Sequence, residues 1–178
     1  MSGQDMDGYM QYEAMSSWYD DLTQNWDADE ARNLWSNLFS NYFSIRDGFH
    51  FEHQSLTVLH VKRFRHKLLT VIVDNHVSGV SPTTTWTSIV DKLTTQMTAD
   101  RMEMSENARL QDTFGIATVG FSSRFYVLHP GNSTLVPHPD TRGRTLEFKD
   151  DEPTIVRVLL SIKDLATRSP RSHGNESQ

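Results

Sequence analysis

Residues 56–74, LTVLHVKRFRHKLLTVIVD, determine the fold class that we predict for this chain. Apolar and β-branched residues fill both ends of this stretch, and a short basic segment separates them. The pattern predicts an antiparallel hairpin with strands over 55–61 and 67–74. The second strand is apolar almost throughout, which is typical of a strand that is buried on both faces of a sheet.

The flanking sequence extends this hairpin into a larger sheet with helices. A second pair of apolar segments, 113–119 and 124–129, predicts another hairpin. Apolar residues recur at helical spacing over 29–43 and 86–99, and a last helix is expected after Asp151. Because helices interrupt paired strands, we predict an α/β or α+β fold with a mixed β-sheet flanked by helices and leave the strand order open.

Length and charge divide the 178 residues into three parts. Residues 1–31 contain eight acids and no Lys or Arg, which leaves 15 of the 23 acids and all 17 Lys and Arg for the rest. We therefore predict an acidic N-terminal arm over 1–28, partly disordered or a short helix. A single domain is expected over 29–166, followed by a disordered tail over 167–178.

Composition excludes several classes of chemistry. The chain has no cysteine, so it forms no disulfide and uses no thiolate nucleophile. Its first residues lack the basic and apolar regions of a signal peptide, and no apolar run approaches the ~20 residues that cross a bilayer. We expect an intracellular protein, cytoplasmic or nuclear, that has no membrane partner.

The order of the segments resembles a known group of proteins. A helix with Asn41-Tyr42-Phe43 near its end precedes the first strands, and the best segments of the resemblance are 114–128 and 146–151. Over about residues 30–166 the chain resembles small fungal proteins related to the PD-(D/E)xK, or restriction-endonuclease-like, nuclease superfamily. The resemblance implies a restriction-endonuclease-like core.

The same resemblance implies that the nuclease site has been lost. Active members carry Asp at the start of the second core strand and Glu-x-Lys or Asp-x-Lys on the third, because two carboxylates hold Mg²⁺ and the lysine orients water. By position these residues fall at about Ser55, Val73 and Asn75, none of which fits. Asp74 is a catalytic candidate only if the site is displaced by one residue. We therefore predict no catalytic residue and no cofactor.

The eight histidines do not change this prediction. His50 and His53 flank Phe51-Glu52 without the spacing of a His-Glu-x-x-His zinc motif. His129 and His138 lack the tight spacing of a structural zinc site. Surface or hydrogen-bonding roles are the better interpretation, and no metal site is predicted.

Two surfaces are candidates for binding a partner. The first is the basic segment of the hairpin, made of Lys62, Arg63, Arg65 and Lys67. These side chains either bind the phosphates of a nucleic acid or form a solvated, charged edge that keeps the hairpin soluble. The second is an apolar stripe at helical spacing in the acidic arm, a docking segment made of Tyr12, Met15, Trp18, Tyr19 and Leu22. Because the arm is acidic and the hairpin segment is basic, the arm is also predicted to screen the charge of the hairpin.

These observations lead to an ordered set of functional hypotheses. The first is a non-catalytic interaction protein on a degenerate nuclease-like scaffold, with an unidentified protein partner and an unassigned oligomeric state. The second is a nucleic-acid-binding module without cleavage activity. The third is a metal-dependent nuclease with a displaced active site.

Overall fold

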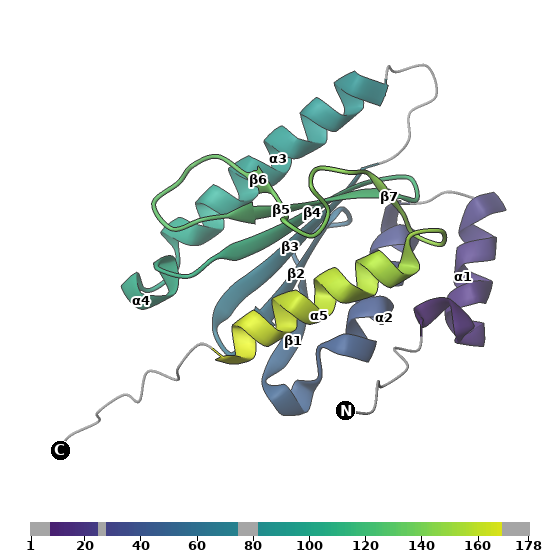
Figure 1. The fold of residues 1–178 in the computed structure, drawn as a ribbon, viewed down its shortest axis with the longest axis horizontal. Coiled ribbons are helices and arrows are strands. Elements are labelled where there is room, and N and C mark those ends of the chain that lie inside the picture. Colours follow the sequence, from purple (N-terminus) through teal and green to yellow (C-terminus); the bar gives the residue numbers. More distant parts are fainter. Residues whose placement is uncertain (1–7, 25–27, 75–81, 169–178) are drawn as a thin grey trace.

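A computed structural model describes residues 8–24, 28–74 and 82–168, which form a mixed α/β fold (Figure 1). The helices are α1 (Glu13–Gln24), α2 (Ala28–Tyr42), α3 (Pro82–Met102), α4 (Glu106–Arg109) and α5 (Glu152–Arg168). The strands are β1 (Phe49–His53), β2 (Val58–Arg63), β3 (His66–Asp74), β4 (Thr113–Val119), β5 (Ser122–Leu128), β6 (Val136–Pro137) and β7 (Leu146–Glu147). Short 3-10 helices are η1 (Tyr9–Gln11) and η2 (Ile45–Asp47).

One sheet contains all seven of these strands, in the order β1-β2-β3-β4-β5-β6, with β7 paired to β5. Strands β1, β2 and β3 form an antiparallel meander. Strand β4 runs parallel to β3, because α3 carries the chain back over the sheet between them. Strand β5 returns antiparallel to β4. The fold is therefore α/β with a mixed sheet, as the sequence predicts.

Both predicted hairpins are confirmed, but strand β1 was not predicted. Its sequence, Phe49-His50-Phe51-Glu52-His53, carries no run of β-branched residues and contains three polar side chains. The strand forms because β2 offers it a complete edge, with Phe49 opposite Arg63 and His53 opposite Leu59. Strand β6 was missed for a similar reason, since its two residues pair with β5 inside a loop of turn-forming residues.

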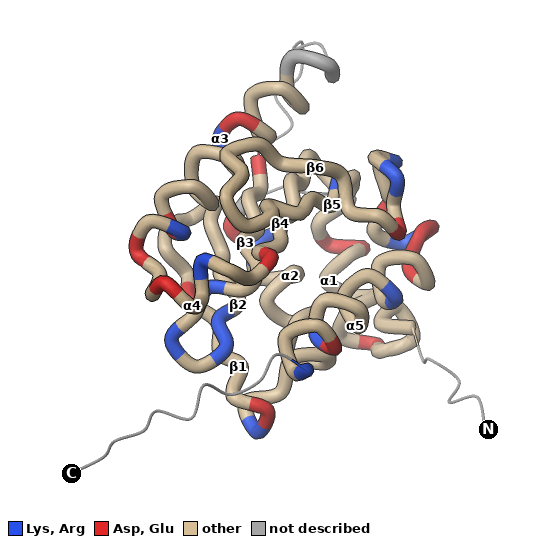
Figure 2. Tube along the Cα trace, turned by 60° about the vertical axis from the view of Figure 1, so that its left-hand side comes forward, with Lys and Arg blue, Asp and Glu red and all other residues tan. Residues whose placement is uncertain are grey.

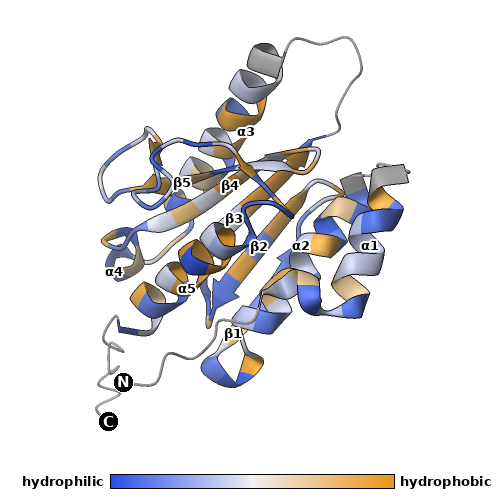
Figure 3. Cartoon of the chain, turned by 45° about the vertical axis from the view of Figure 1, so that its right-hand side comes forward, coloured by the Kyte–Doolittle hydropathy of each residue, from blue (hydrophilic) through white to orange (hydrophobic). Residues whose placement is uncertain are grey.

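Helices cover the two faces of the sheet unequally. Figure 3 shows apolar residues concentrated in the central strands and on the helix surfaces that face them. Helix α3 covers one face with Ile89, Leu93 and Met97, which pack against Ile72 of β3. Helices α1, α2 and α5 cover the other face, where the larger core lies (Figure 1). Among the described helices, none combines the length and apolar character that a bilayer-spanning helix needs.

Candidate functional site

A buried polar network lies between α3 and strands β2 and β3. Alternation along β2 sends Leu59 and Val61 into the larger core, so His60 faces α3. Thr70 is its partner in the β2–β3 register and faces the same way. Asp100, near the end of α3, lies above both, with one carboxylate oxygen 3.6 Å from His60 Nδ1. His60 is fully buried and Asp100 almost so.

Hydrogen bonds satisfy this network on every side. His60 Nε2 lies 2.6 Å from the Gln54 amide oxygen, which only accepts, so the ring carries its proton there. The Thr70 hydroxyl lies 3.2 Å from His60 Nδ1 and 3.4 Å from an Asp100 carboxylate oxygen. The Gln96 amide nitrogen donates to both the Gln54 oxygen and an Asp100 oxygen, at 3.1 and 2.9 Å. Burial lowers the pKa of His60, while the Asp100 charge opposes that shift.

Lys67 supplies the positive charge that balances Asp100. Its ammonium group donates to Asp100 at 2.6 Å and lies 3.4 Å from the exposed carboxylate of Glu103. Although burial alone acts in the opposite direction, the hydrogen bond and charge of Asp100 raise the pKa of Lys67. The Asp100 carboxylate is thus both paired and hydrogen-bonded, as a buried charge requires. The network therefore ties β2, β3 and α3 together.

A β-bulge places Lys67 in this network. Leu69 belongs to the larger core on the opposite face, so simple alternation puts Lys67 on that face as well. The register shifts between Val61 and Lys62, because Val61 pairs with Leu69 while Lys62 pairs with Lys67. One extra residue on β3 reverses the direction of its neighbour. Lys67 consequently points to α3 and reaches Asp100.

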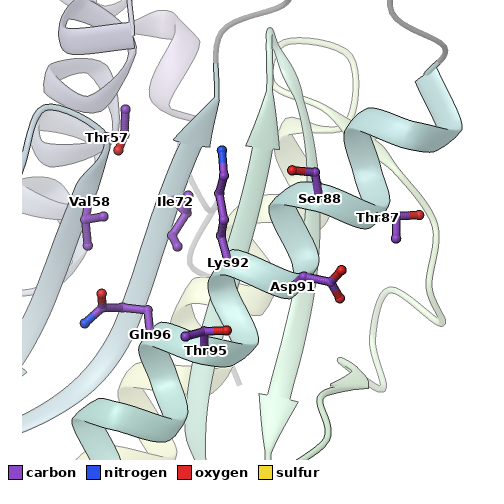
Figure 4. Close-up of a pocket in the computed structure, with 9 residues that line it drawn as sticks. All are labelled: Thr57, Val58, Ile72, Thr87, Ser88, Asp91, Lys92, Thr95 and Gln96. Atoms are coloured by element: carbon purple, nitrogen blue, oxygen red, sulfur yellow. The ribbon is translucent and has the colours of Figure 1, made fainter.

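An open groove of about 720 Å³ continues from this network along α3 (Figure 4). The lining residues are mostly hydroxyl, amide or charged side chains: Thr57, Val58, Ile72, Thr87, Ser88, Asp91, Lys92, Thr95 and Gln96. Figure 4 shows Gln96 pointing from α3 toward β2, while Lys92 extends toward the end of β3. A ligand in the groove meets Gln96 but does not reach His60, which is fully buried. Gln96 is thus the member of the network that lines the groove.

The structure describes two of the three positions assigned to the lost nuclease site, Ser55 and Val73. Ser55 is exposed in the β1–β2 connection, where its carbonyl accepts from Arg32 at 2.6 Å. Val73 lies close to this connection in space, since its amide donates to the Thr57 carbonyl. Its side chain, however, belongs to the larger core. Asn75 lies outside the described residues. Asp74 faces α3 instead and forms an ion pair with Lys92 at 3.2 Å.

The four cations of the basic hairpin do not form one cluster. Lys62 pairs with Glu52 on the α3 face, and Lys67 pairs with Asp100 there. Arg63 points to the opposite face, where its guanidinium donates to the Ala166 carbonyl at the end of α5. Arg65 is exposed at the turn itself. Strand alternation and the bulge thus divide the predicted site into a neutralised lysine pair and two arginines, of which Arg65 is exposed and Arg63 half-buried.

The predicted docking stripe of the N-terminal segment is largely part of the domain's own core. Met15 and Leu22 are buried in the larger core, so they are unavailable to a partner in this structure. Tyr19 packs on the ring of Phe121, with centroids 4.5 Å apart. Tyr12 and Trp18 keep about half of their surface, being 47% and 40% exposed. The prediction is corrected accordingly: residues 9–24 are a packed element and not a free arm.

This packing also separates the acidic segment from the basic hairpin. The Met10 amide donates to Glu152 at the start of α5, whereas Arg63 binds the Ala166 carbonyl near its end. Fourteen residues of helix between these two points span about 21 Å. Exposed charges at that separation are largely screened at ordinary ionic strength. The described acids of α1 therefore do not screen the hairpin.

The residues of the network were not predicted, although part of the signal was present. His60 and Thr70 are polar positions inside two apolar strands that form one hairpin, and pairing the strands brings them together. Asp100 was not accessible to this reasoning, because the face that α3 presents depends on tertiary packing. Among the described residues, no group of three His, Asp or Glu side chains is arranged to hold a metal ion. Comparison with protein-family models, curated proteins and solved structures found no match.

Proposed function

We propose that this protein is a non-catalytic, intracellular protein-interaction module built on a PD-(D/E)xK-like scaffold. Support comes first from the order of elements. A helix, three meandering strands, a crossover helix and a strand parallel to the third follow one another as α2, β1, β2, β3, α3 and β4. The sequence resemblance implies a restriction-endonuclease-like core, and this arrangement is compatible with it.

One observation carries the non-catalytic part of the proposal. Val58 and Ile72 are direct partners in the β2–β3 register and face α3 at the end of β3. A PD-(D/E)xK nuclease needs carboxylates on these neighbouring strands to hold its metal. On the α3 face these strands carry the apolar Val58 and Ile72, while Val73, the position assigned to the Glu, belongs to the larger core on the other face. The nearby Asp74 forms an ion pair with Lys92. A hard cation finds no oxygen pair between Val58 and Ile72.

Binding of a protein is favoured over binding of nucleic acid by the charges of the hairpin. Phosphate backbones are bound by several cations whose counterions are released on binding. Two of the four hairpin cations, Lys62 and Lys67, are neutralised by Glu52 and by Asp100 with Glu103. The arginines that stay available lie beside an exposed aromatic ring, which suits a mixed apolar and charged partner.

A cleavage assay tests the catalytic part of this proposal. The full chain is incubated with plasmid, single-stranded DNA and RNA in Mg²⁺ or Mn²⁺, beside an Asp74→Ala variant as the matched control. We expect equal, background cleavage for both proteins. Metal-dependent cleavage that the Asp74→Ala change abolishes would overturn the proposal and make Asp74 a working ligand at a displaced site.

A second assay tests the interaction part. The tagged chain is crosslinked in its native host, once with an amine-reactive reagent and once with ultraviolet light, and the recovered protein and nucleic acid are quantified. We expect a protein partner at near-stoichiometric yield. Recovery of nucleic acid without a protein partner would replace the proposal with the nucleic-acid-binding alternative.

A further inference from the structure

The tip of the β2–β3 hairpin holds an exposed aromatic ring in a strained backbone conformation. Arg63 pairs with His66, so Phe64 and Arg65 form a two-residue turn. Phe64 has φ of 55°, in a region where glycine is the usual residue and a side chain costs about 1–2 kcal/mol. The residue is nevertheless 52% exposed. A large apolar residue that is both strained and half exposed points to a function other than stability.

Neighbouring groups hold this ring in one position. The Phe64 amide donates to the Gly48 carbonyl at 2.9 Å, and the ring lies so close to Gly48 that a Cβ there would be 2.6 Å from its nearest carbon. The guanidinium of Arg63 lies 5.2 Å from the ring centroid and is itself held by the Ala166 carbonyl. A ring fixed in advance loses little conformational entropy when a partner binds.

Positive charge without acidic partners surrounds the ring. Figure 2 shows Lys and Arg gathered at the β2 end of the molecule. Among the described residues, no carboxylate pairs with Arg46, Arg63 or Arg65, because Asp47, the acid beside them, binds Lys163 at 3.1 Å. Together with the exposed Ile45, these residues form a surface that we call the tip patch: Ile45, Arg46, Arg63, Phe64 and Arg65.

Two hollows flank Phe64 and give the tip patch its shape. One, of about 510 Å³, is lined by Ile45, Arg46 and Arg63 among others. The other, of about 580 Å³, lies between the hairpin, α4 and the end of α5, and Leu68 and Ala108 contribute apolar walls to it. An apolar side chain of a partner thus has a place to lie on either side of the fixed ring.

We propose that the tip patch docks an acidic segment of a partner protein, with one large apolar side chain against Phe64 and carboxylates on the arginines. This rests on the proposed interaction function and names the chemistry of its partner. Arginine and aromatic side chains together are the residues that dominate binding energy at protein interfaces. Guanidinium groups bind carboxylates in a planar, bidentate geometry. A bare phosphate backbone leaves Ile45 and the apolar hollow unused.

Fluorescence anisotropy with defined peptides tests this proposal on the full chain. The probes are fluorescein-labelled nonapeptides with four alternating Asp and Glu on each side of a central Phe, Leu or Gly. We expect the Phe- and Leu-centred peptides to bind at least about tenfold more tightly than the Gly-centred one, as an anchored side chain requires. A 20-nucleotide single strand, in the same buffer, is expected to bind more weakly than either.

Three variants locate the binding. Phe64→Gly and Arg65→Glu are each expected to weaken Phe-centred binding at least about tenfold, as changes at an interface hot spot do. Trp18→Ala, which removes a part-exposed aromatic of α1 outside the tip patch, is the matched control and leaves binding unchanged. Because glycine accepts the Phe64 backbone conformation, thermal unfolding of Phe64→Gly is expected at or above the wild-type midpoint. Lost binding then reports the lost ring and not a lost fold.

Several results would overturn the tip-patch proposal. They are equal affinity for Gly- and Phe-centred peptides, binding that survives Phe64→Gly, tighter binding of the oligonucleotide, or no peptide binding at all. None of them revives cleavage, so the tip patch fails separately from the non-catalytic proposal. A metal-dependent cleavage activity with intact peptide binding would remove the non-catalytic proposal and leave the tip patch standing.

Discussion

The lysines and the arginines of one hairpin have opposite environments, although six residues of sequence contain all four. Lys62 and Lys67 lie on the α3 face, where Glu52 and Asp100 neutralise them. Arg63 and Arg65 lie at the opposite face and at the turn, without a carboxylate among the described residues. Removing one partner of a charge pair inside a fold destabilises it, whereas charge left unpaired on a surface is available to a partner.

The two regions also differ in local strain and in how completely their groups are packed or hydrogen-bonded. Around Asp100 each buried polar atom of His60, Thr70 and Lys67 has a partner within the network. At the tip, a strained Phe64 stays exposed beside Arg63. Natural proteins accept such a local cost where binding requires it. The comparison therefore separates residues that hold the sheet together from residues that are free to recognise something.

The largest loss of unfolding free energy is expected when the contacts of Lys67 and His60 with Asp100 are removed. Asp100→Ala leaves His60 and Lys67 without their shared carboxylate, and removal of one member of a buried ion pair costs about 3 kcal/mol of unfolding free energy. Glu103→Ala is the matched control, because it removes the exposed partner of the same lysine, at a cost within about 0.5 kcal/mol. Urea unfolding measures both. Equal costs for the two variants would contradict the role given to the network.

A smaller effect is expected from breaking the tip side at Gly48. Gly48→Ala introduces a Cβ at φ of 85° and 2.6 Å from the Phe64 ring, so backbone strain and displacement of the ring add to about 2 kcal/mol. Gly120→Ala, at φ of 59° with open space around it, reports the backbone strain by itself, about 1 kcal/mol. Thermal unfolding compares them. If Gly120→Ala costs as much as Gly48→Ala, the ring is not held against Gly48.

The smallest expected effect is a dependence of the unfolding free energy on pH, which comes from the buried His60. Burial lowers the pKa of His60, so between its usual value of about 6.5 and the lower folded value the unfolded chain binds a proton that the folded chain does not. Unfolding free energy is therefore expected to fall as pH decreases below about 6.5. Burial lowers the pKa values of His53 and His138 as well, which adds to the same trend.

His60→Gln isolates the contribution of the buried ring. Glutamine keeps polar atoms at this position but does not titrate, so the decrease between pH 7 and pH 5 is expected to be shallower than in the wild type. His50→Gln serves as the control, since His50 is exposed on β1. Urea unfolding across the pH series measures the slopes. An unchanged slope in His60→Gln would show that the network does not hold the ring neutral.

Local sequence patterns predicted most of the fold but little of the candidate site. The two hairpins and the helices that became α2, α3 and α5 follow from alternation and helical spacing. Strand β1 was missed because its pairing comes from the edge of β2 and not from its own residues. The Asp100 network was missed because α3 carries apolar and polar residues with little segregation, so its orientation is set by the sheet beneath it.

What the sequence by itself determined is the fold class, the hairpin and the absence of a carboxylate at Ser55, Val73 or Asn75, because these depend on residue types and on periods of two and 3.6. Only the tertiary structure decided which charges meet. Lys67 and Asp100 are 33 residues apart, and Arg63 and Ala166 are 103 apart. A single bulge beside Lys62 also reverses the direction of Lys67. Sequence periodicity does not predict where the pairing of two strands shifts by one residue.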